Sequence, residues 1–212
     1  KTMQIFSMMA PNRRKEKKLS MIEFLTNTYE LTNDMSHLEE KEIFLESTSS
    51  MVFDRVNRIV YAGISPRTNA VQLIIWCRHN NYELVLFETE SHTGSPIYHT
   101  DVLMYVGTEI IGICFDVITK EHRDYVKEKV STYHDVVELS PEQIEKFCGN
   151  AIEAKNKNDE LFLILSTTAY KALNEEQIEK LLKSYSDIIH SDIPTIEKYG
   201  GGSARCMLTE LF

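Results

Sequence analysis

The chain has 212 residues, a formal net charge of −9 and 42% hydrophobic residues, a composition typical of a globular protein with one sizeable core. No run of the sequence approaches the ~20 apolar residues that a membrane-spanning helix needs. The acidic balance argues against a nucleic-acid partner, and the one basic cluster, at 13–18, is interpreted as the solvated start of a helix.

Strand-like and helical patterns alternate along the whole chain. In chain order, the apolar periodicity predicts a strand at 4–9, a helix at 14–27, strands at 43–45, 51–54 and 58–62, a helix at 69–80 that Thr68 would cap, and strands at 82–88, 103–106 and 109–115. The second half continues with a helix at 120–131, a strand at 134–139, a helix opening at Ser140, a fully buried strand at 161–165, a helix at 174–185 capped by Asn174, a strand from 188 and a helix at 193–199. Hairpins between the helices argue against a doubly wound parallel sheet, and no Pro- or Gly-rich linker divides the chain.

Four cysteines, Cys77, Cys114, Cys148 and Cys206, are spread widely along the chain, without a CxxC pair or zinc-type spacing to histidine. This usage suits free thiols in a reducing compartment, so we expect a cytoplasmic protein. The first three are predicted to be buried structural thiols. Cys206 differs because it follows the glycine-rich sequence GGGSAR at 200–205.

Three segments bring chemically useful residues to strand ends and turns. The segment FLESTSSMVFD at 44–54 places Glu46 before a turn of small residues. In PIYHTDVLM at 96–104, a strand would put His99 and Asp101 on the same face, because side chains alternate along a strand. In GGGSARCM at 200–207, glycines allow a positive φ and close approach to a ligand, and Arg205 can lower the pKa of the Cys206 thiol.

Together with APNRR at 10–14, these segments resemble the guanidine-modifying enzyme superfamily of the pentein fold, whose members include arginine deiminases, dimethylarginine hydrolases and amidinotransferases. The sequence is most similar to a bacterial branch of amidinotransferase-like or citrulline-utilisation hydrolases, in which segments resembling APNRR, FLEGTGS, YHTNV and GGGSxRCM occur in this order. The chain has APNRR, FLESTSS, YHTDV and GGGSARCM, and the resemblance covers essentially its whole length.

The resemblance implies an α/β fold, the pentein-type five-bladed α/β propeller built from ββαβ units, with the site on its central axis. Members of the superfamily are longer than this chain and carry a further substrate-binding segment upstream of the APNRR-like region. We therefore expect residues 1–212 to form a single catalytic domain, the C-terminal part of a propeller that is incomplete at its N-terminus.

The resemblance also implies roles for five residues. Cys206 would be the nucleophile, His99 the general acid and base, and Glu46 the acid that orients the histidine or binds the substrate. Asp101 would grip the guanidinium, and Arg205 would bind a substrate carboxylate or lower the pKa of Cys206. No metal or organic cofactor is implied. These residue types suit the chemistry, because carboxylates can hold guanidinium N–H groups bidentately while a thiolate attacks the carbon.

One departure from the family pattern affects the turn after Glu46. Ser47 and Ser49 stand where relatives carry glycine. Losing glycine would alter this backbone if either position needs a positive φ.

The sequence assigns no catalytic role to the remaining polar residues, and for one of them it leaves two interpretations open. Asn150 is either a turn residue or part of a loop that lines the site, and the pair Asp54-Arg55 is interpreted as exposed charge. The remaining histidines lie in mostly polar contexts and are expected at the surface: His37, His79, His92, His122, His134 and His190.

The sequence therefore predicts a cofactor-independent hydrolase that attacks the guanidino or ureido carbon of arginine, citrulline or a related small molecule through a covalent cysteine intermediate. Two alternatives remain open. An amidinotransferase would use the same cysteine and histidine but pass the amidino group to an amine. A binding protein on the pentein fold would lack catalysis. The oligomeric state is not specified by the sequence.

Overall fold

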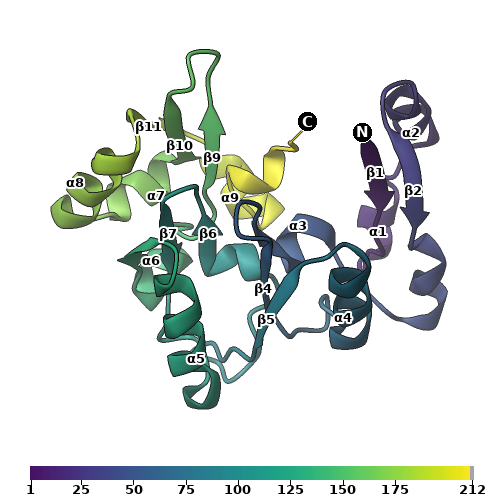
Figure 1. Ribbon diagram of the computed structural model, residues 1–212, viewed down its shortest axis with the longest axis horizontal. Helices are drawn as coiled ribbons and strands as arrows, with labels where there is room; N and C mark the ends of the chain where they lie inside the picture. Colours follow the sequence, from purple (N-terminus) through teal and green to yellow (C-terminus); the bar gives the residue numbers. More distant parts are fainter. Residues whose placement is uncertain (211–212) are drawn as a thin grey trace.

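The computed structural model describes residues 1–210 and has a mixed α/β fold in which small sheets alternate with helices (Figure 1). The strands are β1 (Thr2–Ile5), β2 (Glu30–Asp34), β3 (Val52–Asp54), β4 (Ile59–Gly63), β5 (Glu83–Phe87), β6 (Met104–Val106), β7 (Ile110–Ile113), β8 (Asp135–Glu138), β9 (Ile152–Lys155), β10 (Leu161–Ser166) and β11 (Asp187–Ser191). The helices are α1 (Pro11–Arg14), α2 (Leu19–Thr26), α3 (Ser47–Ser50), α4 (Ala70–His79), α5 (Lys120–Ser131), α6 (Pro141–Glu145), α7 (Thr167–Ala172), α8 (Glu175–Ser184) and α9 (Pro194–Gly200), with short 3₁₀ turns η1 (Ser36–Lys41), η2 (Thr100–Val102) and η3 (Arg205–Met207).

Within residues 1–210 the same supersecondary unit occurs three times. In each unit an antiparallel hairpin leads into a helical crossover, which returns a third strand parallel to the second. The units are β3-β4-β5 through α4, β6-β7-β8 through α5, and β9-β10-β11 through α7 and α8. The N-terminal strands β1 and β2 are parallel across α1 and α2. The ββαβ unit that the resemblance implies is therefore present.

Apolar strand residues from all three units share one large core. Tyr61 of β4, Ile111 of β7 and Leu163 of β10 belong to the same buried cluster. A smaller cluster joins Leu73 and Cys77 of α4 to its own sheet. In Figure 1, α4, α5 and α8 lie at the outside of the molecule, whereas α3 and α9 lie between the sheets. The segments that carry the predicted site residues therefore meet in the middle.

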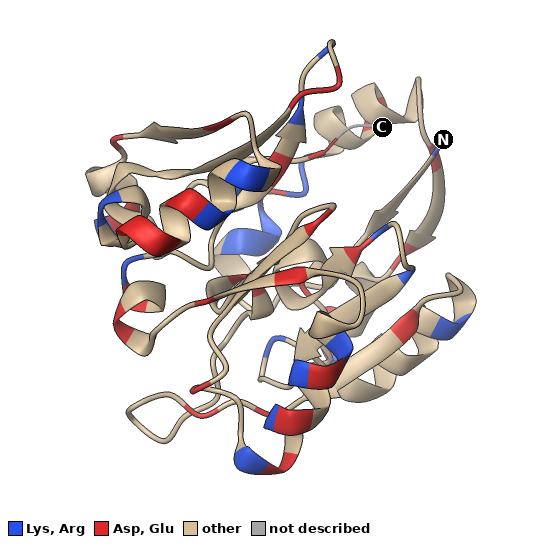
Figure 2. Cartoon of the chain, turned by 60° about the vertical axis from the view of Figure 1, so that its left-hand side comes forward, with Lys and Arg blue, Asp and Glu red and all other residues tan. Residues whose placement is uncertain are grey.

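Charged residues of both signs are interspersed along the chain (Figure 2). Among the described residues, no helix combines the length and the apolar character that crossing a membrane would require.

Several helix boundaries follow from capping residues that are visible in the sequence. Asn174 caps α8 and Ser140 caps α6, each through a capping box with the glutamine three residues later. Helix α5 begins and ends at the predicted residues. The predicted helix α4 is confirmed, but its cap is Asn69 rather than Thr68, because the Asn69 side chain accepts the backbone N–H of Gln72.

The single helix predicted at 14–27 is wrong. Helix α1 ends at Arg14 and α2 begins only at Leu19, and the lysine-rich stretch between them leaves the helical path where Lys17 pairs with Glu39. The predicted strand at 43–45 is also wrong, because only Leu45 forms an isolated bridge there, with Thr68.

The predicted strand through His99 and Asp101 is likewise wrong, since residues 100–102 form the 3₁₀ turn η2 and β6 begins only at Met104. Strand β10 was expected to be fully buried, but only Leu163, Leu165 and Ser166 are buried, and its other residues are partly exposed. Strands β2 and β9 and helix α7 were not predicted.

Two residues expected at the surface are buried. The His134 side chain is fully enclosed and Asp54 is 2% exposed. The His134 Nε2 atom lies 3.5 Å from Asp54 Oδ2, where the β3-β4-β5 unit meets the β6-β7-β8 unit.

The three cysteines that were predicted to be structural are buried free thiols, as expected: Cys77, Cys114 and Cys148.

Candidate active site

Glu46 is a buried carboxylate with three partners. Its Oε2 atom accepts a 2.6 Å hydrogen bond from His99 Nε2, its Oε1 atom accepts the Met9 backbone N–H at 2.8 Å, and Arg67 Nη1 lies 3.4 Å from Oε2. Burial opposes ionisation of Glu46, but the hydrogen bonds from His99 and Met9 and the charges of His99 and Arg67 hold its pKa below the usual value. Glu46 is therefore a fixed anion that orients the imidazole.

The turn after Glu46 adopts the conformation for which relatives use glycine. Ser47 has φ 51°, in the left-handed region that side chains disfavour, whereas Ser49 does not take a positive φ. The Ser50 hydroxyl closes the turn by accepting the Glu46 backbone N–H at 3.0 Å and donating to the Arg67 carbonyl at 2.9 Å. One of the two serine positions thus needs a positive φ, and this turn presents Glu46 to the histidine.

His99 is placed by the residue that follows it. The buried Thr100 hydroxyl donates to the Ser50 carbonyl at 2.7 Å and accepts the Gly63 backbone N–H at 3.0 Å. These bonds hold the start of η2 against the turn after Glu46, with His99 extended just before it. The histidine and the carboxylate meet although the strand that was predicted to align His99 with Asp101 does not form.

Cys206 lies in a loop that is fixed at both sides. The buried carboxylate of Glu197 on α9 accepts the hydroxyls of Ser203 and Thr168, each at 2.7 Å. Gly201 ends α9 with φ 67°, and a Cβ on Gly202 would lie 3.0 Å from the Cys206 sulfur. Glycine is therefore favoured at Gly201 by its positive φ, whereas a side chain at Gly202 would crowd the Cys206 sulfur.

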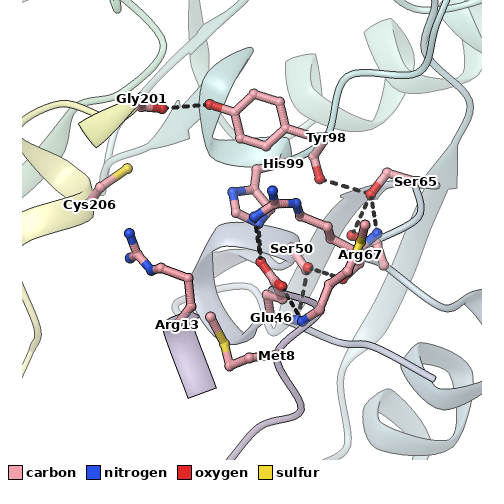
Figure 3. A network of polar contacts seen from close by, with 12 residues as sticks. Met8, Arg13, Glu46, Ser50, Ser65, Arg67, Tyr98, His99, Gly201 and Cys206 are labelled. Carbon is pink, nitrogen blue, oxygen red and sulfur yellow. Dashed lines mark hydrogen bonds and ion pairs between the residues drawn. The ribbon is translucent and has the colours of Figure 1, made fainter. Parts of the chain in front are cut away.

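Tyr98 connects the histidine segment to the cysteine loop. Its hydroxyl donates to the Gly201 carbonyl at 2.9 Å, and the Arg67 guanidinium lies 5.4 Å from its ring centroid. Figure 3 shows the Cys206 sulfur pointing toward the side of the site where His99 lies, with the Arg13 guanidinium also directed into this space. The thiol and the imidazole thus face a common region.

The effect of Arg205 on the pKa of the Cys206 thiol stays a prediction, because other groups dominate that pKa. Cys206 as a residue is exposed, but burial of its sulfur and the nearby charge of Asp101 raise the pKa of the thiol. Arg205 instead faces Asp101, with Nε 3.8 Å from Oδ2, and its Nη1 atom donates to the Ala151 carbonyl at 3.4 Å. Arg205 therefore lies against the Asp101 carboxylate.

Asp101 borders the thiol, with Oδ2 3.7 Å from Cys206 Sγ, and its predicted grip on a guanidinium stays a prediction. Burial raises the pKa of this carboxyl against the opposing charges of His99 and Arg205. Its Oδ1 atom has no hydrogen-bond partner within residues 1–210. A cationic group arriving beside the sulfur would supply that partner.

The sequence did not predict that two arginines, Arg13 and Arg67, belong to the candidate site, and it did not decide whether Asn150 does. Arg13, taken as solvated, pairs with Glu16 at 2.9 Å on α1 and faces the site. Arg67 touches Glu46 and carried no motif signal. Asn150, whose two interpretations were left open, lies 3.2 Å from the Cys206 sulfur and so belongs to the site. Arg13 lies in the APNRR segment, which was the available signal.

Comparison with known proteins identifies the family of the chain and the fold that it shares. A family model described as N,N dimethylarginine dimethylhydrolase, eukaryotic, matches residues 1–212. No curated protein sequence matches the chain.

Solved structures share the fold at low sequence identity. The apo structure of ArgZ, an arginine dihydrolase from cyanobacteria, is 14% identical with a TM-score of 0.74, covering 98% of this chain and 31% of that one. The N-terminal domain of ArgZ bound to substrate is 16% identical with a TM-score of 0.71, covering 95% and 68%. A dimethylarginine dimethylaminohydrolase adduct with S-methyl-L-thiocitrulline is 16% identical with a TM-score of 0.61, covering 96% and 69%. The chain thus spans about a third of full-length ArgZ.

Proposed function

The chain belongs to the family described as N,N dimethylarginine dimethylhydrolase, eukaryotic, within the guanidine-modifying superfamily, and from this membership we propose that it hydrolyses a C–N bond at the guanidino carbon of arginine or a methylated arginine. The observation that carries the proposal is the joint placement of the Cys206 thiol and the Glu46–His99 pair around one space. The similar solved structures are of an arginine dihydrolase and a dimethylarginine dimethylaminohydrolase, so family membership supports the same substrate class as the site.

The first half of the reaction makes a covalent intermediate. The thiol proton passes to His99, and the Cys206 sulfur forms a bond to the guanidino carbon. His99, held by Glu46, then donates its proton to the departing nitrogen while the C–N bond breaks. Ammonia or an alkylamine leaves, and a thiouronium group remains on the cysteine.

The second half uses water. His99 accepts a proton from water as the oxygen adds to the thiouronium carbon. The C–S bond then breaks, the sulfur regains its electron pair, and the hydroxyl proton leaves to the released amine or to solvent. The product is a ureido compound.

Two charged residues suit the two ends of such a substrate. The Asp101 Oδ1 atom is buried without a hydrogen-bond partner among residues 1–210, and Oδ2 of the same carboxylate lies 3.7 Å from the sulfur. This carboxylate would accept guanidinium N–H groups and align the carbon for attack. Arg13 carries an exposed guanidinium directed into the same space, which would bind the substrate carboxylate. Arg205 would position Asp101 rather than touch the substrate.

We extend the proposal to the architecture of the whole chain. Residues 1–212 would act as one catalytic domain whose ββαβ units are blades of a pentein propeller with five blades, with the site on the axis where the blades meet. The three units and the central position of α3 and α9 support this arrangement.

The test is product analysis with arginine, dimethylarginines and citrulline. We expect the full protein to release ammonia or an alkylamine and form a ureido product, and Cys206→Ala and His99→Ala to abolish release. His79→Ala, at an exposed helix end, is the matched control and should retain activity. Transfer of the amidino group to an added amine would identify an amidinotransferase. Binding of arginine without any release would identify a binding protein.

A further inference from the structure

Asn150 makes three side-chain contacts, and the one with the Asp101 carbonyl fixes the orientation of its amide. In one of them the Cys206 thiol donates to Asn150 Oδ1 at 3.5 Å, and the other two involve Nδ2. The Asn150 Nδ2 atom lies 3.2 Å from the Asp101 carbonyl oxygen and 3.2 Å from the Cys206 sulfur. A carbonyl oxygen can only accept, so the amide nitrogen must face Asp101. The same nitrogen then has its second N–H for the sulfur. The residue is 2% exposed, so bulk solvent has little access to its amide.

The backbone around Asn150 is built to bring it this close. Phe147 has φ 66°, and the Asn150 N–H donates to the Phe147 carbonyl at 2.9 Å, closing a tight turn. A Cβ on Gly149 would lie 2.3 Å from the Val102 carbonyl oxygen. Only glycine therefore allows this turn to lie directly against the backbone of η2, where Asp101 is.

The thiolate of Cys206 needs a donor at this position. Burial and the neighbouring Asp101 both oppose its ionisation, and Arg205 faces Asp101, with Nε 3.8 Å from Oδ2, while its Nη1 atom donates to the Ala151 carbonyl. An N–H donor to an anion is stronger than a neutral hydrogen bond. Asn150 is the side-chain N–H placed to supply it.

We propose that Asn150 is a catalytic residue that donates a hydrogen bond to the Cys206 thiolate, stabilising the nucleophile and fixing the direction of its attack. The inference rests on the proposed function in assigning Cys206 as the nucleophile. It adds a neutral donor on the side of the sulfur where Asp101 lies. The amide would exchange a weak contact with the thiol for a strong one with the thiolate.

The experiment measures the rate of Cys206 alkylation by iodoacetamide from pH 6 to 10, followed by mass spectrometry of the intact protein. The three buried thiols have pKa values raised by burial to about 11, 11 and 12 and serve as internal references. Asn150→Asp keeps the shape of the side chain but replaces the donor with a carboxylate. Asn158→Asp adds the same charge at an exposed turn and is the matched control.

For Asn150→Asp we expect the alkylation profile to move to higher pH, with the rate at pH 7 about tenfold lower and the rates converging at high pH. Loss of packing alone would lower the rate at every pH. A folded Asn150→Asp with the profile of the unsubstituted protein would overturn the proposal. Asn150→Ala removes the donor without adding a charge and must shift the profile in the same direction, because a carboxylate beside the sulfur can raise the thiol pKa by repulsion alone. An unshifted Asn150→Ala profile overturns the proposal even where Asn150→Asp shifts, and Asn150→Ala decides alone if Asn150→Asp does not fold. A shifted profile without turnover would refute the hydrolase alone, and turnover with an unshifted profile would refute the role of Asn150 alone.

Discussion

Ser47 carries the disfavoured backbone conformation of the turn that presents Glu46. At φ 51° its Cβ crowds the following carbonyl, a conformation that costs a non-glycine residue about 1 to 2 kcal/mol. We expect Ser47→Gly to stabilise the protein by about 1 kcal/mol, because glycine avoids the clash but loses more entropy on folding. Chemical denaturation measures this difference, and the melting temperature should rise by about 3 °C.

The neighbouring serine supplies the matched comparison. Ser49 lies on the same short helix without a positive φ, so Ser49→Gly should destabilise the protein by about 0.5 to 1 kcal/mol. Equal effects of the two substitutions would show that the turn does not hold strain at Ser47.

The carboxylate of Glu46 makes stability depend on acid pH. Its pKa in the folded protein lies below the usual value of 4.5, so its contribution is complete above that value and is lost as pH falls through the folded pKa. We expect Glu46→Gln to cost about 2 kcal/mol at pH 7, because the amide cannot accept the His99 and Met9 hydrogen bonds as an anion does. Urea unfolding at a series of pH values should show the gap between the two proteins closing below pH 4.5. A gap that is constant with pH would mean that Glu46 is not ionised in the folded state.

At the scale of elements, the sequence predicts best where local signals decide. The caps Ser140 and Asn174 announce their helices because each bonds within its own first turn. The alternation of hairpins and helices likewise predicts the repeated unit. The strand predicted through His99 fails because tertiary contacts of Thr100, to residues 37 and 50 positions away, pull that segment into a 3₁₀ turn.

The candidate site shows the same limit. Motifs identified Glu46, His99 and Cys206, and the structure brings the first two into contact. The orientation of the Arg205 side chain could not be predicted. It depends on the position of the buried Asp101 carboxylate, which only the folded structure places beside Arg205. Arg67 was missed because its role exists only through the fold that carries it to Glu46.

The turn before β9 depends on one glycine. Because a Cβ on Gly149 would lie 2.3 Å from the Val102 carbonyl oxygen, a backbone atom that cannot step aside, we expect Gly149→Ala to destabilise the protein by about 3 kcal/mol. Gly200, the last residue of α9, would make only an ordinary 3.6 Å contact with Ile196, so Gly200→Ala should be neutral or slightly stabilising. Thermal denaturation of the two variants decides this. A tolerated Gly149→Ala would mean that the two backbones are not in close contact.

At the scale of the whole molecule, a buried pair connects two ββαβ units. His134 and Asp54 face each other at 3.5 Å, and burial lowers the pKa of His134 despite the opposing charge of Asp54. The pKa of His134 in the folded protein lies below its usual value of 6.5, so the unfolded chain binds the proton more readily. The free energy of unfolding therefore decreases as pH falls through 6.5. We expect unfolding free energy to fall more steeply from pH 7.5 to 5.5 in the unsubstituted protein than in His134→Gln. Parallel curves would show that His134 does not titrate on unfolding.

The overall charge of −9 bears on how a cationic substrate reaches the site. A net negative charge on the protein raises the rate at which it encounters a guanidinium compound. Salt weakens this attraction, because at 0.1 M ionic strength charges more than about 10 Å apart are largely screened from each other. We expect kcat/KM for the guanidino substrate to fall as NaCl rises from 0.02 to 0.3 M, with kcat little changed. Helix α5 lies at the outside of the molecule (Figure 1) and carries the exposed acids Asp124 and Glu128, neither of which belongs to the candidate site. Replacing both with Lys should make kcat/KM lower at low salt and flatten its salt dependence, because the change alters the field without touching the site. A salt dependence identical in the two proteins would show that the summed charge does not guide the substrate, and that local contacts with Asp101 alone set its capture.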